Sequence, residues 1–247
     1  MELIVNVKRQ DFRESESYEQ KFLFATDDTG ISVASLLSRL NSRNPLLDVN
    51  GEKARKINWE SSCLQKKCGA CAMRINGKPA LACECRLSAL DLRGGELTLE
   101  PLKKFPVVTD LVVDRSILYE NLKNIRAWLK ENVEIQEKQT EYLYEASRCI
   151  QCGCCLEICP NFCAGGEFYG MSAMVPVARM LEAMPSEDKK ELLKKYKKHI
   201  YGGCGKSLAC ADVCPMGIDI EKLMVRSNEM SFWSLLNQTK ILFPFFH

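Results

Sequence analysis

The first hundred residues alternate between apolar and polar positions in a way that is typical of strands. Two short apolar runs at residues 2–7 and 21–25, separated by a polar and acidic segment, predict a first hairpin. Apolar residues then recur with helical spacing over residues 31–40. Residues 95–102 alternate again, as a closing strand would. These elements predict a small mixed sheet with one helix.

The strongest local turn signal is the Asn-Gly pair at residues 76 and 77. Both residue types tolerate positive φ, so this pair between two apolar runs predicts a tight hairpin in which residue 75 faces residue 78. Counting outward from the turn, residue 71 pairs with residue 82. The hairpin is therefore predicted to place Cys83 beside Cys71.

After Phe105 the pattern changes from strands to helices. Apolar residues from Ile117 to Leu129 have helical spacing, and little beyond them alternates with a period of two. We predict three segments, with a first domain at 1–105, a linker and connecting helix at 106–139, and a helical cysteine-bearing domain at 140–247. The apolar tail at residues 232–246 is predicted to pack on a partner or on its own domain rather than on lipid.

Composition narrows the setting of the protein. The chain has 247 residues, 46% of them hydrophobic, and a formal net charge of +2, so we expect no nucleic-acid partner. No stretch reaches about 18 apolar residues, so no membrane-spanning helix is predicted. The first residues lack the features of a secretory signal, and the fourteen cysteines are therefore expected to be reduced thiols in the cytoplasm.

The first group of cysteines has the spacing of a plant-type two-iron site. Cys63, Cys68 and Cys71 are followed by Cys83, which predicts a 2Fe-2S cluster held by these four thiolates. Gly69 would let the loop backbone approach closely. Cys83 is the favoured fourth ligand, and Cys85, on the same strand face, is the alternative. A structural zinc site or buried core thiols are competing interpretations, although zinc ribbons usually space their ligands as two close pairs.

The second group of cysteines has the bacterial ferredoxin spacing twice, with one member missing from the second run. In two-cluster ferredoxins, the fourth cysteine of each run binds the other cluster. This exchange assigns to a 4Fe-4S cluster the residues Cys149, Cys152, Cys155 and Cys214. It leaves for the other cluster Cys159, Cys204 and Cys210. Ser207 stands in place of the missing cysteine, so three thiolates predict a 3Fe-4S cluster. Cys154 and Cys163 fit neither run and are predicted to be small apolar residues.

One 2Fe-2S motif, a 4Fe-4S run and a run suited to 3Fe-4S, in this order, resemble the iron–sulfur subunit of succinate dehydrogenases and fumarate reductases. The resemblance extends over essentially the whole chain and includes the contiguous stretches 57–60, 68–79, 101–116 and 159–161. It implies an α+β fold with an N-terminal β-grasp plant-type 2Fe-2S ferredoxin domain. An all-helical bacterial-type ferredoxin domain is implied to follow.

The resemblance also implies partners. A flavoprotein subunit with covalent FAD would carry the dicarboxylate site, and a membrane-anchor subunit would hold the chain at the cytoplasmic face of the cell membrane. Electrons would pass between FAD and the membrane quinone through the three clusters. Ubiquinone-reducing members commonly carry a tryptophan shortly after the first Cys-Pro and a histidine after the first cysteine of the second run. This chain has Phe162-Cys163-Ala164 and Cys204-Gly205, so it looks more like the menaquinone-linked type with a dihaem cytochrome b anchor that holds haem b.

Two other classes of protein remain as alternatives. One is a free-standing ferredoxin-type carrier, and the other is the iron–sulfur subunit of another quinone- or disulfide-linked oxidoreductase. Such subunits typically keep both four-cysteine runs, and Ser207 argues against them. The chain offers no catalytic acid, base or nucleophile, since its two histidines, His199 and His247, lie in a charged segment and at the terminus. The bond-making site is therefore expected on the partner.

Overall fold

The computed structural model describes residues 1–92 and 94–242, and only the backbone is described for residues 186–187 and 233–242. The predicted packing of the apolar tail falls mostly outside the described side chains. Within the described residues, none of the helices has the length and apolar character needed to cross a membrane.

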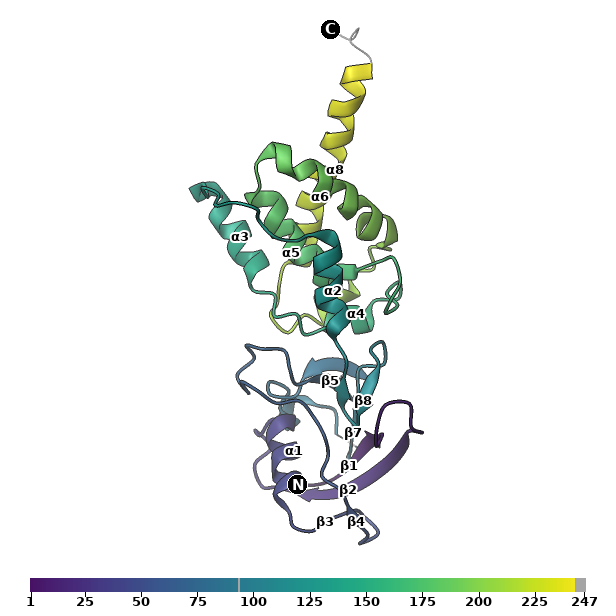
Figure 1. Ribbon diagram of the computed structural model, residues 1–247. Coiled ribbons are helices and arrows are strands. Elements are labelled where there is room, and N and C mark those ends of the chain that lie inside the picture. The colour runs from purple at the N-terminus through teal and green to yellow at the C-terminus, as the bar shows by residue number, and fades with distance from the viewer. Residues whose placement is uncertain (93, 243–247) are drawn as a thin grey trace. The chain divides into compact units, whose positions relative to one another are not determined.

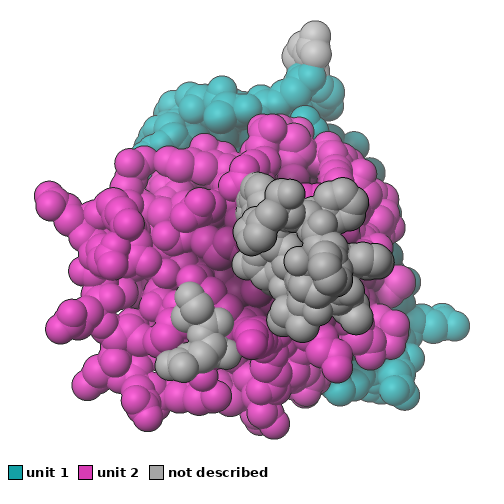
Figure 2. Space-filling view, turned by 90° about the horizontal axis from the view of Figure 1, so that it is seen from above, with its two compact units in different colours: residues 1–115, 150–158 teal, residues 116–149, 159–247 magenta. Residues whose placement is uncertain are grey.

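The chain forms two compact units, which are coloured separately in Figure 2. The first unit contains Met1–Arg115 and Ile150–Ile158, and the second contains Ser116–Cys149 and Cys159–His247. These units do not divide at the predicted limits, because the first unit extends to Arg115 and includes a piece of the cysteine-rich half. The predicted limits of the folding domains stay a prediction.

The first unit is built around a mixed sheet (Figure 1). Its five strands have the order β2-β1-β7-β5-β6, with β1 and β7 parallel and the other neighbours antiparallel. With a helix after the first hairpin, this is the β-grasp arrangement, which confirms the predicted fold of this half. Its elements are β1 (Glu2–Arg9), β2 (Tyr18–Ala25), α1 (Val33–Ser42), β3 (Leu46–Leu47), β4 (Lys53–Ala54), β5 (Ala72–Ile75), β6 (Lys78–Leu81), a 3₁₀ turn (Leu87–Ala89), β7 (Glu96–Glu100), β8 (Val107–Thr109), β9 (Val112–Val113) and α4 (Cys154–Ile158).

The alternation of β1 places its odd-numbered side chains in the core. Leu3, Val5 and Val7 are buried, as are the apolar side chains of α1, and Arg9 follows them on the same face with no exposed surface. A buried arginine requires a partner, because an unpaired charge in the interior is strongly unfavourable. That partner comes from the loop between β8 and β9.

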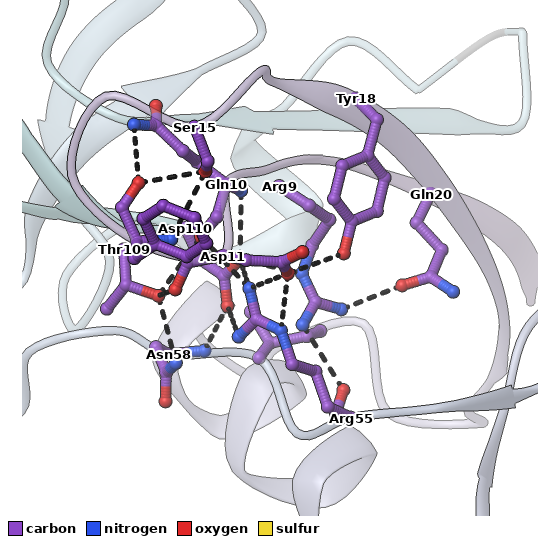
Figure 3. A network of polar contacts seen from close by, with 12 residues as sticks. Arg9, Gln10, Asp11, Ser15, Tyr18, Gln20, Arg55, Asn58, Thr109 and Asp110 are labelled. Atoms are coloured by element: carbon purple, nitrogen blue, oxygen red, sulfur yellow. Dashed lines mark hydrogen bonds and ion pairs between the residues drawn. The ribbon is translucent and has the colours of Figure 1, made fainter.

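Asp110 is the centre of a buried polar network that ties three segments of the first unit together (Figure 3). Its carboxylate accepts hydrogen bonds from Arg9 Nε at 2.9 Å and from the Arg55 guanidinium at 2.7 and 2.8 Å. The backbone N–H groups of Gln10 and Asn58 donate to it at 3.1 and 2.8 Å. The network thus fixes residues 55–58, shortly before Cys63, the first cysteine of the chain.

Among its described residues, the regular secondary structure of the second unit is entirely helical. Its central helix is α5 (Gly170–Ala183), whose apolar side chains are almost all buried and which contacts α2, α3, α6 and α8. The other elements are α2 (Ser116–Ile125), a 3₁₀ turn (Glu137–Gln139), α3 (Thr140–Ser147), α6 (Ser186–His199), a 3₁₀ turn (Tyr201–Gly203), α7 (Ala209–Asp212) and α8 (Ile220–Leu242). The prediction of a second, helical half is therefore confirmed.

The helix predicted from Ile117 to Leu129 is shorter than its apolar pattern suggests. α2 ends at Ile125, and the next residue, Arg126, has φ of +59°. A left-handed residue cannot continue a right-handed helix. The apolar residues beyond it therefore belong to an irregular segment, which the periodicity alone does not distinguish from helix.

Candidate cofactor-binding sites

The β5–β6 hairpin brings two cysteines of the first group together. Asn76 and Gly77 have φ of +47° and +79°, and residue 75 pairs with residue 78, as predicted from the Asn-Gly signal. Beyond the ladder, the N–H of Ala82 donates to the carbonyl of Cys71 at 3.1 Å. Cys83 is the next residue, so the hairpin delivers it to Cys71 at the end of the loop.

The four cysteines of this group lie close enough to influence one another through hydrogen bonds and charge. The pKa of Cys63 is lowered to about 7 by the N–H groups of Gln65 and Lys67, at 3.4 and 3.3 Å from its sulfur, and by a hydrogen bond from the Cys68 thiol. Burial raises the pKa of Cys71 to about 12, and both Cys83 and the charge of Cys68 also act on it. The predicted set of four is thus brought to one place, while its role as a ligand set stays a prediction.

The backbone of this loop suits an anionic group. Leu64, Lys66 and Gly69 have φ of +53°, +60° and +74°, between residues of ordinary conformation. Such alternation turns successive N–H groups toward a common concavity that favours negative charge. The N–H of Ala70, which donates to the Cys68 sulfur at 3.5 Å, belongs to the same set of donors. Four converging thiols with backbone donors therefore fit a 2Fe-2S cluster.

Cys85, the alternative fourth ligand, has a different environment. Burial is the main cause that raises the pKa of its thiol, and the charge of Glu84 adds to it. Its carbonyl accepts the N–H of Val33 at 2.9 Å, at the first residue of α1. Cys85 therefore packs where the helix begins, and among the described residues Cys83 is the one that interacts with Cys71 in this way.

A single-ion site is a distinct arrangement from a cluster site. Within residues 1–92 and 94–242, no group of three or more His, Cys, Asp or Glu side chains is arranged to hold one metal ion. None of the fourteen cysteines, all of which are described, forms a disulfide. Iron–sulfur clusters distribute their thiolates over several irons.

The segment Ile150–Ile158 packs within the first unit although it belongs to the bacterial ferredoxin run. A Cβ on Gly69 would lie 2.9 Å from both Cα and Cβ of Cys152, so only glycine fits there. Gly69 therefore does permit a close approach, and the structure shows that its neighbour is the Cys152 backbone. A Cβ on Gly153, at φ of +88°, would lie 3.1 Å from the Phe105 ring.

An ion pair completes this docking. The carboxylate of Glu157, in α4, is almost fully buried and accepts hydrogen bonds from Arg74 Nη1 at 2.9 Å and from the N–H of Lys104 at 3.0 Å.

The pKa of Cys152 is lowered to about 7, mainly by a hydrogen bond from the Cys154 thiol, and the charge of Arg115 contributes. The structure thus places Cys152 and Cys155 of the predicted 4Fe-4S set in the first unit.

The other two members of that set lie in the second unit, where an arginine links the segments that carry them. Arg148, next to Cys149, donates to Glu145 at 2.8 Å and to the carbonyl of Met216. The pKa of Arg148 is raised chiefly by the hydrogen bond to Glu145, and the charge of Cys214 also contributes. Arg148 therefore links the segments that carry Cys149 and Cys214, while the assignment of both to one cluster stays a prediction.

The three cysteines of the predicted 3Fe-4S set line one small cavity in the second unit. Cys159, Cys204 and Cys210 line this cavity together, and Ser207 lines it as well. Burial raises the pKa of Cys210 to about 11, and the charges of Cys159 and Cys204 add to this. Three thiols and a serine around one cavity fit a three-iron cluster with a vacant corner.

The two cysteine runs have the same backbone path at an offset of 55 residues. Gln151 and Gly153 are left-handed, with φ of +51° and +88°, and so are Lys206 and Leu208, with φ of +56° and +57°. The helices α4 and α7 then begin at equivalent residues, 154 and 209. Ser207 therefore occupies the position that Cys152 occupies in the first run, between the same pair of left-handed residues.

The two remaining cysteines differ from each other. Cys154 is fully buried, as predicted for a small apolar residue, although its thiol also donates to Cys152. Cys163 is exposed, so that prediction was wrong for Cys163. Sequence reasoning assigned no role to Gly153, Glu157 or Arg115, although a charged residue inside a buried cysteine run is a signal that could have marked Glu157.

Comparisons with known proteins agree with both halves of this description. Residues 4–120 match the family described as 2Fe-2S iron-sulfur cluster binding domain, and residues 145–218 match the 4Fe-4S dicluster domain. The sequence is 37% identical to the succinate dehydrogenase iron-sulfur subunit of Bacillus subtilis, over 87% of this chain and 86% of the relative. The chain belongs to the family of succinate dehydrogenase and fumarate reductase iron–sulfur subunits. This confirms the family resemblance.

Other members and structures extend the comparison of this iron–sulfur subunit. The fumarate reductase iron-sulfur subunit of Wolinella succinogenes is 30% identical over 67% of this chain and 73% of its own length. A solved structure titled Mycobacterium smegmatis Sdh1 complex in the apo form contains a chain with a TM-score of 0.71 and 22% identity, covering 94% of this chain and 97% of that one. At this identity the likeness supports the fold.

Proposed function

We propose that the chain is the electron-transfer iron–sulfur subunit of a membrane-bound succinate dehydrogenase or fumarate reductase. The observation that carries this proposal is the spacing of eleven cysteines, which forms three predicted ligand sets in a chain of this family. When bound, the clusters would carry single electrons between the FAD of a flavoprotein and a quinone in the membrane.

Each cluster would be held by its own set of cysteines. Cys63, Cys68, Cys71 and Cys83 would bind the 2Fe-2S cluster, and backbone N–H groups already donate to the sulfurs of Cys63 and Cys68. The 4Fe-4S cluster would be held by Cys149, Cys152, Cys155 and Cys214. The 3Fe-4S cluster would be held by Cys159, Cys204 and Cys210, with Ser207 at the corner that lacks a thiolate.

The dicarboxylate chemistry would take place on the partner flavoprotein. His199 stacks on Tyr169 with ring centroids 4.3 Å apart, and its Nδ1 bonds the carbonyl of Glu167 at 2.8 Å. A histidine engaged in this way has a structural role on the surface of the second unit. His247 lies outside the described residues.

The membrane partner that best matches the sequence is a dihaem cytochrome b that binds menaquinone. Support comes from Phe162-Cys163-Ala164 and Cys204-Gly205, where ubiquinone-reducing members commonly carry tryptophan and histidine. This anchor would hold the chain at the cytoplasmic face of the cell membrane. Copurification of a quinone-reactive complex without haem would contradict this choice of anchor.

Electron paramagnetic resonance with iron quantification tests the proposal. We expect about nine irons per chain, a three-iron signal in the oxidised protein and a two-iron signal after reduction. A double-cubane spectrum without the three-iron signal would instead indicate a ferredoxin-type carrier or a subunit of a disulfide-linked complex. A colourless protein without iron would contradict every cluster assignment.

A further inference from the structure

Arg115 connects two cysteine loops of the first unit, and sequence reasoning gave it no role. Its Nη1 donates to the carbonyls of Gly69 and Cys152 at 2.8 and 3.4 Å, and its Nη2 donates to the carbonyl of Ala70 at 2.9 Å. Nη2 also forms an ion pair with Glu60. The side chain is 13% exposed, so its charge is shielded from most of the solvent.

The contacts that Arg115 makes require an arginine and could not all be made by a lysine. One planar guanidinium reaches carbonyls on two separate segments at once, which the single nitrogen of lysine cannot do in the same geometry. The two segments touch where Gly69 meets the Cys152 backbone, and this is where the guanidinium donates. Arg115 therefore holds the loop between Cys68 and Cys71 against Cys152.

The charge of Arg115 has an effect separate from its hydrogen bonds. Reduction of an iron–sulfur centre by one electron adds one negative charge to it, and net charge close to a centre is one of the factors that set its potential. Glu60 offsets part of this positive charge, but Glu60 is 41% exposed and hence more strongly screened by water. A net positive contribution remains next to both loops.

We propose that Arg115 is a positioning residue that fixes the 2Fe-2S loop against Cys152 and raises the reduction potentials of the two centres whose ligands it adjoins. This inference rests on the proposed function, because it requires that clusters be bound by these loops. The Arg115 side chain would thus set the spacing of the two loops and, through its charge, raise the reduction potentials of both centres.

Redox titration of the intact complex, followed by electron paramagnetic resonance, tests the inference. Arg115→Gln should shift the two-iron potential to more negative values, and the four-iron potential in the same direction. Arg115→Lys keeps the positive charge but loses the paired donors of the guanidinium. Its potentials should therefore lie between those of Arg115→Gln and those of the wild type. Glu60→Gln removes the offsetting charge and should shift the potentials to more positive values.

The control is Arg13→Gln, which removes an exposed ion pair with Asp114, the neighbour of Arg115. It should leave both potentials unchanged. Unchanged potentials in fully loaded Arg115→Gln would overturn the inference. If that variant does not load its clusters, an unchanged Glu60→Gln protein would overturn it instead. Absence of cluster signals from the wild-type complex would be a failure of the proposed function, and the two failures are therefore distinguishable.

Discussion

The two cysteine runs follow one backbone path but have different neighbours. Residues 150–158 of the first run pack within the sheet-bearing unit, where the Cys152 backbone lies against Gly69 and Glu157 pairs with Arg74. At the positions equivalent to Cys152 and Glu157, the second run has Ser207 beside a small cavity and an exposed Asp212. The shared path accounts for the ligand spacing, while the neighbours account for the residues between the ligands.

Position 153 and its equivalent, 208, illustrate the same difference. Both residues are left-handed, yet one is glycine and the other is leucine. A Cβ on Gly153 would make a tight contact with the Phe105 ring, whereas Leu208 lines the cavity and has room for its side chain. Backbone conformation alone therefore does not require glycine at this position, and the close neighbour favours it.

The largest expected effect concerns Ser207, because replacing it would make the two runs equivalent. Ser207→Cys adds a thiolate at the position of Cys152, so we expect the iron content to rise from about nine to about ten per chain. The oxidised-state three-iron signal should disappear. Ser207→Ala, which adds no ligand, should keep that signal. A Cys variant with an unchanged spectrum and iron content would contradict the assignment of this corner.

The next effect concerns the ion pair that docks α4. Glu157→Ala should lower the free energy of unfolding by about 3 kcal/mol, because it leaves Arg74 mostly buried and paired, among the described residues, with the more distant Glu100. Asp212→Ala, at the equivalent exposed position, should change it by less than about 0.5 kcal/mol. Denaturant unfolding of both variants measures the difference. Equal losses would show that the two runs do not differ in their docking.

The smallest effect concerns the glycine and leucine at the equivalent left-handed positions. Gly153→Ala should destabilise the protein by about 1–2 kcal/mol, through the left-handed backbone and the contact with Phe105. Leu208→Gly relieves backbone strain but loses a half-buried side chain, so its net effect should stay below about 1 kcal/mol. Thermal unfolding monitored by circular dichroism compares the two. A harmless Gly153→Ala would mean that the Phe105 ring moves freely.

Local signals in the sequence were sufficient for the main strands of the first half and for the β5–β6 hairpin. The Asn-Gly turn predicted the register of that hairpin, since it depends on residues close in the chain. The ligand sets that the cysteine spacing predicts stay predictions. The return of residues 150–158 to the first unit was not predictable in this way. It depends on contacts such as Glu157 with Arg74, between residues 83 positions apart.

The β8–β9 pair was also missed, for a related reason. Its strands are two or three residues long, too short for any periodicity to register. What holds this region is Asp110, whose buried carboxylate accepts five hydrogen bonds from two segments, residues 9–10 and 55–58. A single aspartate in an apolar stretch gives no sign of partners that lie about 50 and 100 residues earlier in the chain.

The return of Ile150–Ile158 to the first unit has a consequence for biosynthesis. During translation, a nascent chain that has emerged only as far as Arg115 still lacks the segment that contacts Arg74 and Phe105, so its first unit is unfinished. Domains usually fold in order as they leave the ribosome. Here, the amino-terminal unit cannot be completed until residues 116–149, which belong to the other unit, and residues 150–158 have been synthesised. A gene fragment that stops at the end of the sheet would therefore encode an incomplete module with an unfilled docking surface.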